Sequence, residues 1–314
     1  LSAQSPLETV TESRIEMERA AATLIARDYQ EVVTYSFIDA EANTRFSGVE
    51  SELVLSNPIS SELSVMRSSL LPGLVVAAAA NTARQQDRVR IFEASRSYHG
   101  TLDAHSEVVR LAALVTGPRL PEQWGTKTES VDFFDLKADV EAVLALASNA
   151  DDIRFVTTDH PALQPGQSAE VVRGDEVIGV LGKLHPRIAK DYDLKRAVYV
   201  FELDAEKAFE SAAPRAETIS KFPAIRRDIA VVVDDEVSAA ELVEAVASAA
   251  PELIRNVRIF DIYKGDRIEA GRKSVAIGLI LQETSRTLTD DDADAAMAAA
   301  VSKLEDKFAA ELRD

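Results

Sequence analysis

The chain has 314 residues, a formal net charge of −18 and no cysteine. Its 46% hydrophobic content is that of a globular protein, and its length is enough for two ordinary domains. The missing cysteines exclude disulfides, thiol nucleophiles and thiolate metal sites, and the acidic charge argues against general nucleic-acid binding, which needs a basic surface. No apolar run approaches the length of a membrane span, so a cytoplasmic protein is the default expectation.

The first two thirds of the chain predict an α+β domain with an antiparallel sheet. A helix is expected over about residues 12–27, an alternating strand over 31–38 and an Ala-rich helix after Pro72. Strands follow in "DRVRIFEASRSYHG" and "EVVRLAALVTG", then a helix in "FFDLKADVEAVLALA" and strands around 169–173, 177–184 and 198–203. Runs of strands with few helices between them favour antiparallel pairing.

A short polar segment, residues 211–220, contains a proline and is interpreted as a linker. It divides the chain into a domain over 1–213 and a second over 217–314. In the second domain the expected order is strand 227–233, helix 239–249, strands 254–263 and 274–281, helix 290–307 and a short strand at 308–312. This βαββαβ order is that of a ferredoxin-like sandwich.

The strand "VRIFDIYKG" places Asp261 and Tyr263 two residues apart, and therefore on one face. Phe260 and Ile262 are expected on the opposite face, under the helices. The face with Asp261 and Tyr263 is then uncovered, and small residues of the next strand, including Ser274, lie beside the ring. An aromatic ring with a carboxylate on an open sheet suits an unstacked nucleic-acid base. Residues 217–286 carry a net charge of only −2, against −5 for residues 287–314, so an RNA contact would be local.

These motifs also carry a family resemblance. "KFPAIRRDIAVVV", "VRIFDIYKG", "KSVAIGLILQ" and "RTLTDDDADAAM" are similar to the ferredoxin-fold anticodon-binding domain of the bacterial phenylalanyl-tRNA synthetase β subunit. Upstream, "YQEVVTYSF", "NPISSELSVMRSSLLPGL", "RVRIFEASRSY", "HPALQPGQSAEV" and "GVLGKLHP" resemble the catalytic-like module of that subunit. The resemblance covers nearly the whole chain and implies a C-terminal fragment, because the family's preceding tRNA-binding and editing-type modules are missing.

The resemblance implies a role in a ligase that joins phenylalanine to tRNA(Phe), using ATP and Mg²⁺. The family works as an (αβ)₂ heterotetramer, with the chemistry in the α subunit. This chain would supply a noncatalytic class II synthetase fold at the α-subunit interface and the anticodon reader, with no cofactor, catalytic residue or metal ligand of its own. Asp261 and Tyr263 would contact anticodon bases, with Ser274 nearby.

The first domain lacks the arginines that a class II synthetase uses to hold ATP. In "RIFEASRSY" Glu93 is present, but Ile91 stands where the second signature motif has arginine, and "VYVFELDAEKAF" lacks the glycine-rich run ending in arginine of the third. Phosphate-bearing transition states need preorganised positive charge, so the domain is predicted to be inactive. Arg67 is interpreted as a paired arginine at a packed turn or subunit contact. His160 and His185 each precede a proline and are interpreted as residues of structural turns.

Two other classes of function stay open. One is a noncatalytic interaction or dimerisation protein that does not bind RNA. The other is a small-molecule regulatory module, which would need a pocket of convergent polar groups that the sequence does not display.

Overall fold

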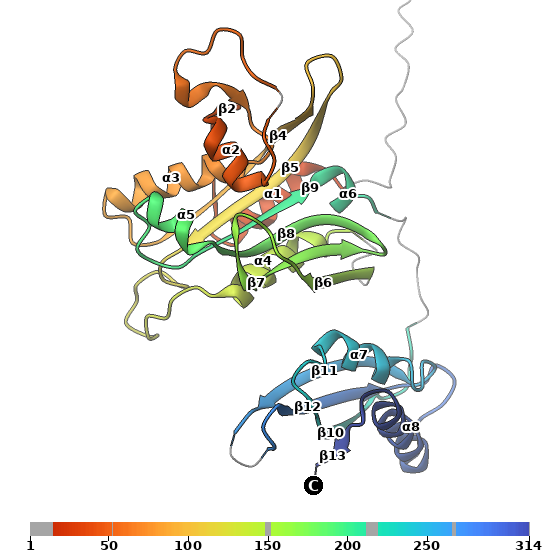
Figure 1. Ribbon diagram of the computed structural model, residues 1–314. Coiled ribbons are helices and arrows are strands. Elements are labelled where there is room, and N and C mark those ends of the chain that lie inside the picture. Colours follow the sequence, from red (N-terminus) through yellow and green to blue (C-terminus); the bar gives the residue numbers. More distant parts are fainter. Residues whose placement is uncertain (1–14, 52, 148–151, 212–218, 266–267, 314) are drawn as a thin grey trace, which may run out of the picture. The chain divides into compact units, whose positions relative to one another are not determined.

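A computed structural model describes residues 15–51, 53–147, 152–211, 219–265 and 268–313 (Figure 1). The chain divides into two compact units, Leu1–Pro214 and Arg215–Asp314. Residues 12–14 of the expected first helix and residues 212–218 of the expected linker lie outside the described residues. Among the helices that are described, none combines the length and the apolar character needed to cross a bilayer.

The first unit is built on a seven-stranded sheet in the order β1-β4-β5-β9-β8-β7-β6. All its pairings are antiparallel except that of β1 with β4, which confirms the predicted antiparallel sheet. Its strands are β1 (Gln30–Glu31), β4 (Val89–Gly100), β5 (His105–Thr116), β6 (Ile153–Thr157), β7 (Leu163–Arg173), β8 (Glu176–Leu184) and β9 (Val198–Asp204). Two short strands, β2 (Phe37–Ile38) and β3 (Val65–Met66), pair separately.

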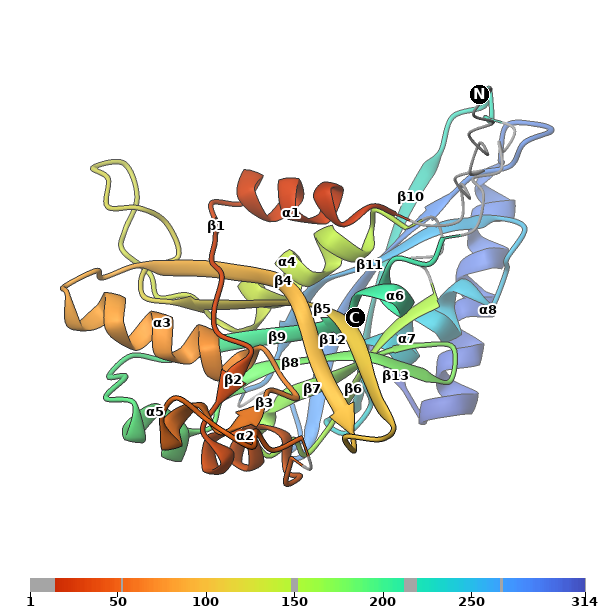
Figure 2. The ribbon, with the colours of Figure 1, turned by 90° about the horizontal axis from the view of Figure 1, so that it is seen from above.

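Helices pack on both faces of this sheet, so the unit has two apolar cores (Figure 2). Neighbouring residues of a strand point to opposite faces: Phe92 joins the core with α1 and α4, whereas Ile91 joins the core with α3. The helices are α1 (Met17–Ala26), α2 (Ala40–Ser47), α3 (Leu71–Ala83), α4 (Phe133–Leu144), α5 (Pro186–Asp191) and α6 (Ala205–Ala208), with a 3₁₀ turn at Ser61–Leu63.

The strand expected over 31–38 is instead two short strands, β1 and β2. The Val32 amide still bonds to the Phe92 carbonyl, at 2.9 Å, but the Thr34 amide donates to the Glu93 carboxylate, at 3.3 Å. A side chain thus satisfies a backbone group that a sheet ladder would otherwise satisfy, and the chain leaves the sheet there. Helix α2 was not predicted, although the Asp39 carboxylate caps it by accepting from the Ala42 amide.

The second unit has the predicted βαββαβ order. Its elements are β10 (Ile225–Asp234), α7 (Ala239–Ala247), β11 (Ile254–Tyr263), β12 (Arg272–Leu281), α8 (Asp290–Phe308) and β13 (Glu311–Leu312), with the sheet order β11-β12-β10-β13. Capping boxes begin both helices, Ser238 with Glu241 and Thr289 with Asp292. Both helices pack on one face of the sheet (Figure 1), where their apolar side chains bury the inner residues of β10 and β12. No described helix of this unit covers the other face.

Candidate nucleic-acid interface

The register of β11 and β12 fixes which side chains lie on the uncovered face. Residues directly opposite each other in an antiparallel pair share a face. Tyr263 lies opposite Ser274 and Asp261 opposite Ala276, whereas Ile262 lies opposite Val275, which is buried under the helices. Asp261, Tyr263 and Ser274 are therefore all on the uncovered face, as the strand pattern predicts.

Phe260 does not lie where the sequence places it. Between Ile259 and Asp261 strand β11 advances two residues while β12 advances one, so Phe260 is the extra residue of a β-bulge. Its ring centre is 5.4 Å from the guanidinium carbon of Arg226. Arg226 is on the uncovered face, because its neighbour Arg227 reaches α8 on the other side. The expectation that the helices cover Phe260 is wrong, and the bulge is the reason.

Contacts on several sides hold the ring of Tyr263. The guanidinium carbon of Arg313 lies 5.5 Å from the ring centre, and Arg313 Nη1 donates to Ser274 Oγ at 3.1 Å. Ser274 is consequently only 4% exposed, whereas Tyr263 is 38% exposed. A Cβ atom on Gly265 would lie 2.6 Å from Tyr263 Oη, so the ring can occupy this position only because residue 265 has no side chain.

Small residues form the floor between the two aromatic rings. Ala276 lies opposite Ala230, and Gly278 lies opposite both Asp228 and Arg258. A Cβ atom on Gly278 would lie 3.0 Å from Asp228 Oδ1, the atom that accepts from Arg226 Nε at 2.9 Å. Glycine thus leaves room for this ion pair against the sheet.

The uncovered face is electrically balanced, in contrast to the strongly acidic chain. Arg226 pairs with Asp228, and Arg272 with Glu311 and Asp234. Within the described residues neither Arg258 nor Arg313 has a carboxylate partner within ion-pair distance. These two arginines can still meet an anionic ligand. The charged side chains of this face are Arg226, Arg258, Arg272, Arg313, Asp228, Asp234, Asp261 and Glu311.

In the first unit, Glu93 of the expected second motif forms a buried ion pair with Arg67. Arg67, 1% exposed, donates from Nη2 to Glu93 Oε1 at 2.9 Å, from Nη1 to Thr34 Oγ1 at 2.9 Å, and from Nε to the Arg96 carbonyl at 3.1 Å. Thr34 in turn donates to Glu93 Oε2 at 2.7 Å. The prediction of a paired arginine is confirmed. A guanidinium held on every side has no donor to spare for a phosphate.

A second carboxylate, Glu202 of β9, lies on the same face. It accepts from the Leu70 amide at 2.6 Å and from the Ser69 hydroxyl at 3.2 Å. Burial raises the pKa of the Glu202 carboxyl above its ordinary value, although the charge of Arg110 and these two hydrogen bonds act in the opposite direction. The buried carboxylate is therefore held beside the residues that precede α3 at an electrostatic cost.

Histidines and acidic residues offer no metal site in the part of the chain that the structure describes, where no group of three or more metal-ligating side chains gathers. His160 Nδ1 accepts from the Ala162 amide, and His185 Nδ1 accepts from the Arg187 amide at the start of α5. Both histidines thus serve as turn residues, as the following prolines predict.

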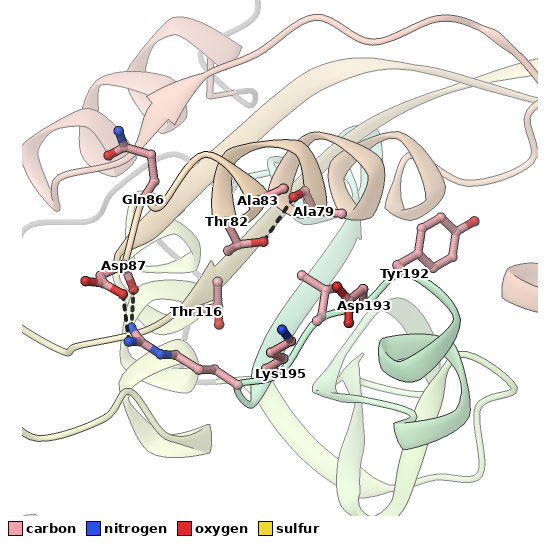
Figure 3. A pocket seen from close by; sticks show the side chains of 11 residues that line it. Ala79, Thr82, Ala83, Gln86, Asp87, Thr116, Tyr192, Asp193 and Lys195 are labelled. Atoms are coloured by element: carbon pink, nitrogen blue, oxygen red, sulfur yellow. Dashed lines mark hydrogen bonds and ion pairs between the residues drawn. The ribbon is translucent and has the colours of Figure 1, made fainter.

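A cavity of about 290 Å³ lies between the end of α3 and the segment 192–196 (Figure 3). Several of its polar groups are already engaged in its own wall. Arg196 bonds to Asp87 at 2.7 Å, the Thr82 hydroxyl bonds to carbonyls of α3, and the Thr116 hydroxyl donates to the Ala197 carbonyl. The hydrogen bonds in the wall of this cavity are those of a packed turn.

A larger and more apolar groove of about 620 Å³ runs between α3 and the segment 33–39. Val33 is 90% exposed and Tyr35 75% exposed at its edge, and Val76 of α3 is 54% exposed. The small side chains of Ala77 and Ala80 line the α3 wall, as expected for a face that another surface can approach closely. Exposed apolar area of this kind is typical of a protein interface.

Comparison with known proteins agrees with both units. Residues 220–313 match the ferredoxin-fold anticodon binding domain, whose ferredoxin fold agrees with the βαββαβ sandwich described above. Residues 2–205 match the phenylalanyl tRNA synthetase beta chain CLM domain. The chain belongs to the phenylalanyl-tRNA synthetase β-chain family.

Curated relatives extend this result. The chain is 44% identical over 313 residues to the phenylalanine–tRNA ligase β subunit of Methylococcus capsulatus, covering 99% of this chain and 39% of that protein. The β subunit of Shewanella oneidensis is 41% identical over 306 residues, covering 96% and 38%. The chain thus spans about two fifths of the length of these relatives. A solved pyrrolysyl-tRNA synthetase of Desulfitobacterium hafniense aligns at 17% identity over 61% of this chain and 64% of that chain, with a TM-score of 0.46, which is too low to support an argument.

Proposed function

We propose that this chain works within a phenylalanine–tRNA ligase and recognises the anticodon of tRNA(Phe) on the uncovered face of its second unit. One observation carries the proposal: the half-exposed ring of Tyr263 lies beside Asp261 on the open sheet of a domain that matches the anticodon-binding family. Aromatic rings on an open sheet are a common platform for unstacked RNA bases.

Each side chain has a distinct role in this proposal. Tyr263 offers a ring face to a base, and Asp261 accepts hydrogen bonds from base amino or imino groups, which provides selectivity. Ser274 is a weaker participant than the sequence implies, because its hydroxyl already accepts a hydrogen bond from Arg313. Arg313 instead places positive charge beside the ring, where it can contact a base or the phosphate that follows it.

The first unit is proposed to bind the catalytic α subunit through the apolar groove along α3, and to catalyse nothing itself. Ile91 stands where ATP would need a free guanidinium, and Arg67 is held in its ion pair with Glu93, so the residues present do not fit ATP with Mg²⁺. These ligands are used elsewhere in the complete enzyme. The match to the β-subunit family supports our further proposal of an (αβ)₂ heterotetramer in the cytoplasm.

The test is aminoacylation by the complete enzyme, with tRNA carrying the native or an altered anticodon. Tyr263→Ala is expected to lower tRNA affinity about tenfold or more, because stacking one base on an aromatic ring contributes about 1–3 kcal/mol. Asp261→Ala should relax discrimination between the two tRNAs. Ile262→Ala is the matched control, since Ile262 is half-exposed on the same strand but lies on the helix-side face.

Unchanged tRNA kinetics in Tyr263→Ala, together with a lowered melting temperature, would show that the ring is part of the core and that the proposal is wrong. A complex with the α subunit that forms normally but leaves no tRNA footprint on this face would favour an interaction protein without RNA binding.

A further inference from the structure

We propose that Phe260 and Arg226 form a second base-stacking position on the uncovered face, so that the sheet holds two unstacked nucleotides of a single-stranded RNA loop. This inference rests on the proposed function, which requires only the position at Tyr263. It adds a second ring, a second guanidinium and a phosphate contact at Arg258.

The bulge in β11 is the first support. It places Phe260 on the same face as Asp261 and Tyr263, with the ring 50% exposed. Counted back from Asp261 and Tyr263, regular alternation would have directed this phenyl ring toward the apolar core, and the bulge lets it share their face instead. Bulges commonly re-aim a side chain next to a functional site, and here the re-aimed residue is a large apolar one facing solvent.

Arg226 supplies the second support, because its guanidinium is oriented before any ligand arrives. The guanidinium carbon lies 5.4 Å from the centre of the Phe260 ring, and Nε donates to Asp228 Oδ1 at 2.9 Å. Both an aromatic ring and a guanidinium plane stack on bases. The Arg226 side chain is 59% exposed, so a base can reach the pair from solvent.

In both positions an arginine guanidinium lies close to an aromatic ring. Arg313 approaches Tyr263 at 5.5 Å and Arg226 approaches Phe260 at 5.4 Å, although the two arginines come from different parts of the chain. The two ring-bearing residues are three positions apart on β11 with the bulge as one of the steps, which corresponds to a backbone separation of roughly 7–10 Å at an ordinary rise of about 3.3 Å per residue. This separation is too large for one base to cover both rings. It suits two bases of the same strand lying over the low floor of alanine and glycine.

Arg258 completes the second position. It lies opposite Gly278, two residues before Phe260 on β11. It is exposed, and among the described residues it has no carboxylate within ion-pair distance. A phosphate that follows a base stacked on Phe260 would find its guanidinium free. Contacts of this kind add affinity without sequence preference.

The experiment measures stacking at each loop nucleotide separately. An RNA stem–loop with the anticodon sequence carries 2-aminopurine at one loop position at a time, and its fluorescence is titrated with the full 314-residue chain. The wild-type chain is expected to quench two positions. Phe260→Leu, which keeps an apolar side chain but removes the ring, should abolish quenching at one of them and lower affinity about tenfold. Phe260→Trp should restore both effects.

Two further variants separate the contributions. Tyr263→Leu should abolish quenching at the other position only. Arg258→Ala should weaken binding equally for all loop sequences and reduce the slope of log affinity against log salt concentration by about one phosphate contact. Ile262→Ala again serves as the control on the helix-side face, and thermal melts verify that each variant is folded.

The outcomes distinguish this inference from the proposed function. Quenching at a single position that is lost in Tyr263→Leu and unaffected by Phe260→Leu would overturn the second position and leave the proposed function standing. Equal affinity of Phe260→Leu and wild type would do the same. A wild-type chain that does not bind the stem–loop at any concentration tested would overturn both.

Discussion

Arg67 in the first unit and Arg226 in the second each lie on a β-sheet beside a carboxylate, yet their surroundings are opposite. Arg67 and Glu93 are 1% and 2% exposed, with hydrogen bonds on every nitrogen of the guanidinium. Arg226 and Asp228 are 59% and 47% exposed, and Arg226 leans over a phenyl ring. The buried pair is a structural support that cannot release a partner, whereas the exposed pair can exchange its contacts for those of a ligand. An ion pair thus indicates a binding site only when its arginine can be reached.

The largest expected effect comes from breaking the buried pair. Arg67→Met leaves Glu93 as an unpaired buried charge and should destabilise the first unit by about 3–5 kcal/mol. Urea unfolding of the chain measures the loss. Arg67→Met with Glu93→Met together should recover most of it, because neither charge then remains. Arg226→Met should change stability by less than about 1 kcal/mol, and a similar loss from both arginines would refute the comparison.

Gly265→Ala tests whether the exposed face is also preorganised. The new Cβ atom would lie 2.6 Å from Tyr263 Oη and 2.8 Å from its Cζ, so the ring must move. RNA affinity should fall by up to about tenfold, the value of one stacked base. Gly125→Ala is a matched control, because nothing lies within 4 Å of its added Cβ atom. Equal RNA binding by both variants would mean that the ring position does not matter.

Thr289→Ala sharpens the contrast in stability between the units. The Thr289 hydroxyl caps α8 by accepting from the Asp292 amide at 3.3 Å. The Asp292 carboxylate in turn accepts from the Thr289 amide at 2.9 Å. Loss of the hydroxyl should destabilise the second unit by about 1 kcal/mol while the first unit unfolds as before. A shift in the unfolding of both units would show that their stabilities are coupled.

The smallest effect is expected from Glu202→Gln. Because burial raises the pKa of Glu202 above its ordinary value of 4.5, the folded state keeps a proton that the unfolded chain has released only at pH values between the unfolded-state and folded-state pKa. Its contribution to stability is therefore greatest below pH 4.5 and is lost as pH rises through the folded-state pKa. Glutamine should remove this pH dependence, so the variant gains stability relative to wild type as pH increases. Melting temperatures across pH 4–8 measure the difference, and parallel curves would contradict it.

Local patterns predicted the second unit well. Alternation in strands and capping residues at helix starts are properties of short segments, and β11 begins and ends where the sequence places it. The facing of Phe260 was missed although a signal exists. The core-side residues Val257 and Ile259 are two apart, but the next, Ile262, follows after three. A strand can keep all three on one face only with a bulge between the last two.

The hydrogen-bond network around Arg67 shows what local sequence patterns could not predict. Its sequence context favoured a paired arginine, but the partners could not be named. Glu93 is 26 residues away and Thr34 is 33 residues away, and only the folded chain brings them together. The same long-range bonds draw Thr34 out of the strand expected over 31–38. The contact of Thr34 with Arg67 and Glu93 therefore explains both the partners of Arg67 that could not be named and the interruption of that strand.

The bulge also determines how many residues strand β11 needs. Phe260 is the residue that the β11–β12 ladder does not need, since Ile259 and Asp261 already lie opposite consecutive residues of β12. Removing position 260 would leave Ile259, Asp261, Ile262 and Tyr263 in regular alternation, with the carboxylate and the phenol on their present side. Homologous chains could therefore gain or lose this single codon without refolding the domain. If the two proposed stacking positions bind RNA, such an insertion or deletion would change the number of nucleotides that the sheet accommodates and leave the position at Tyr263 intact.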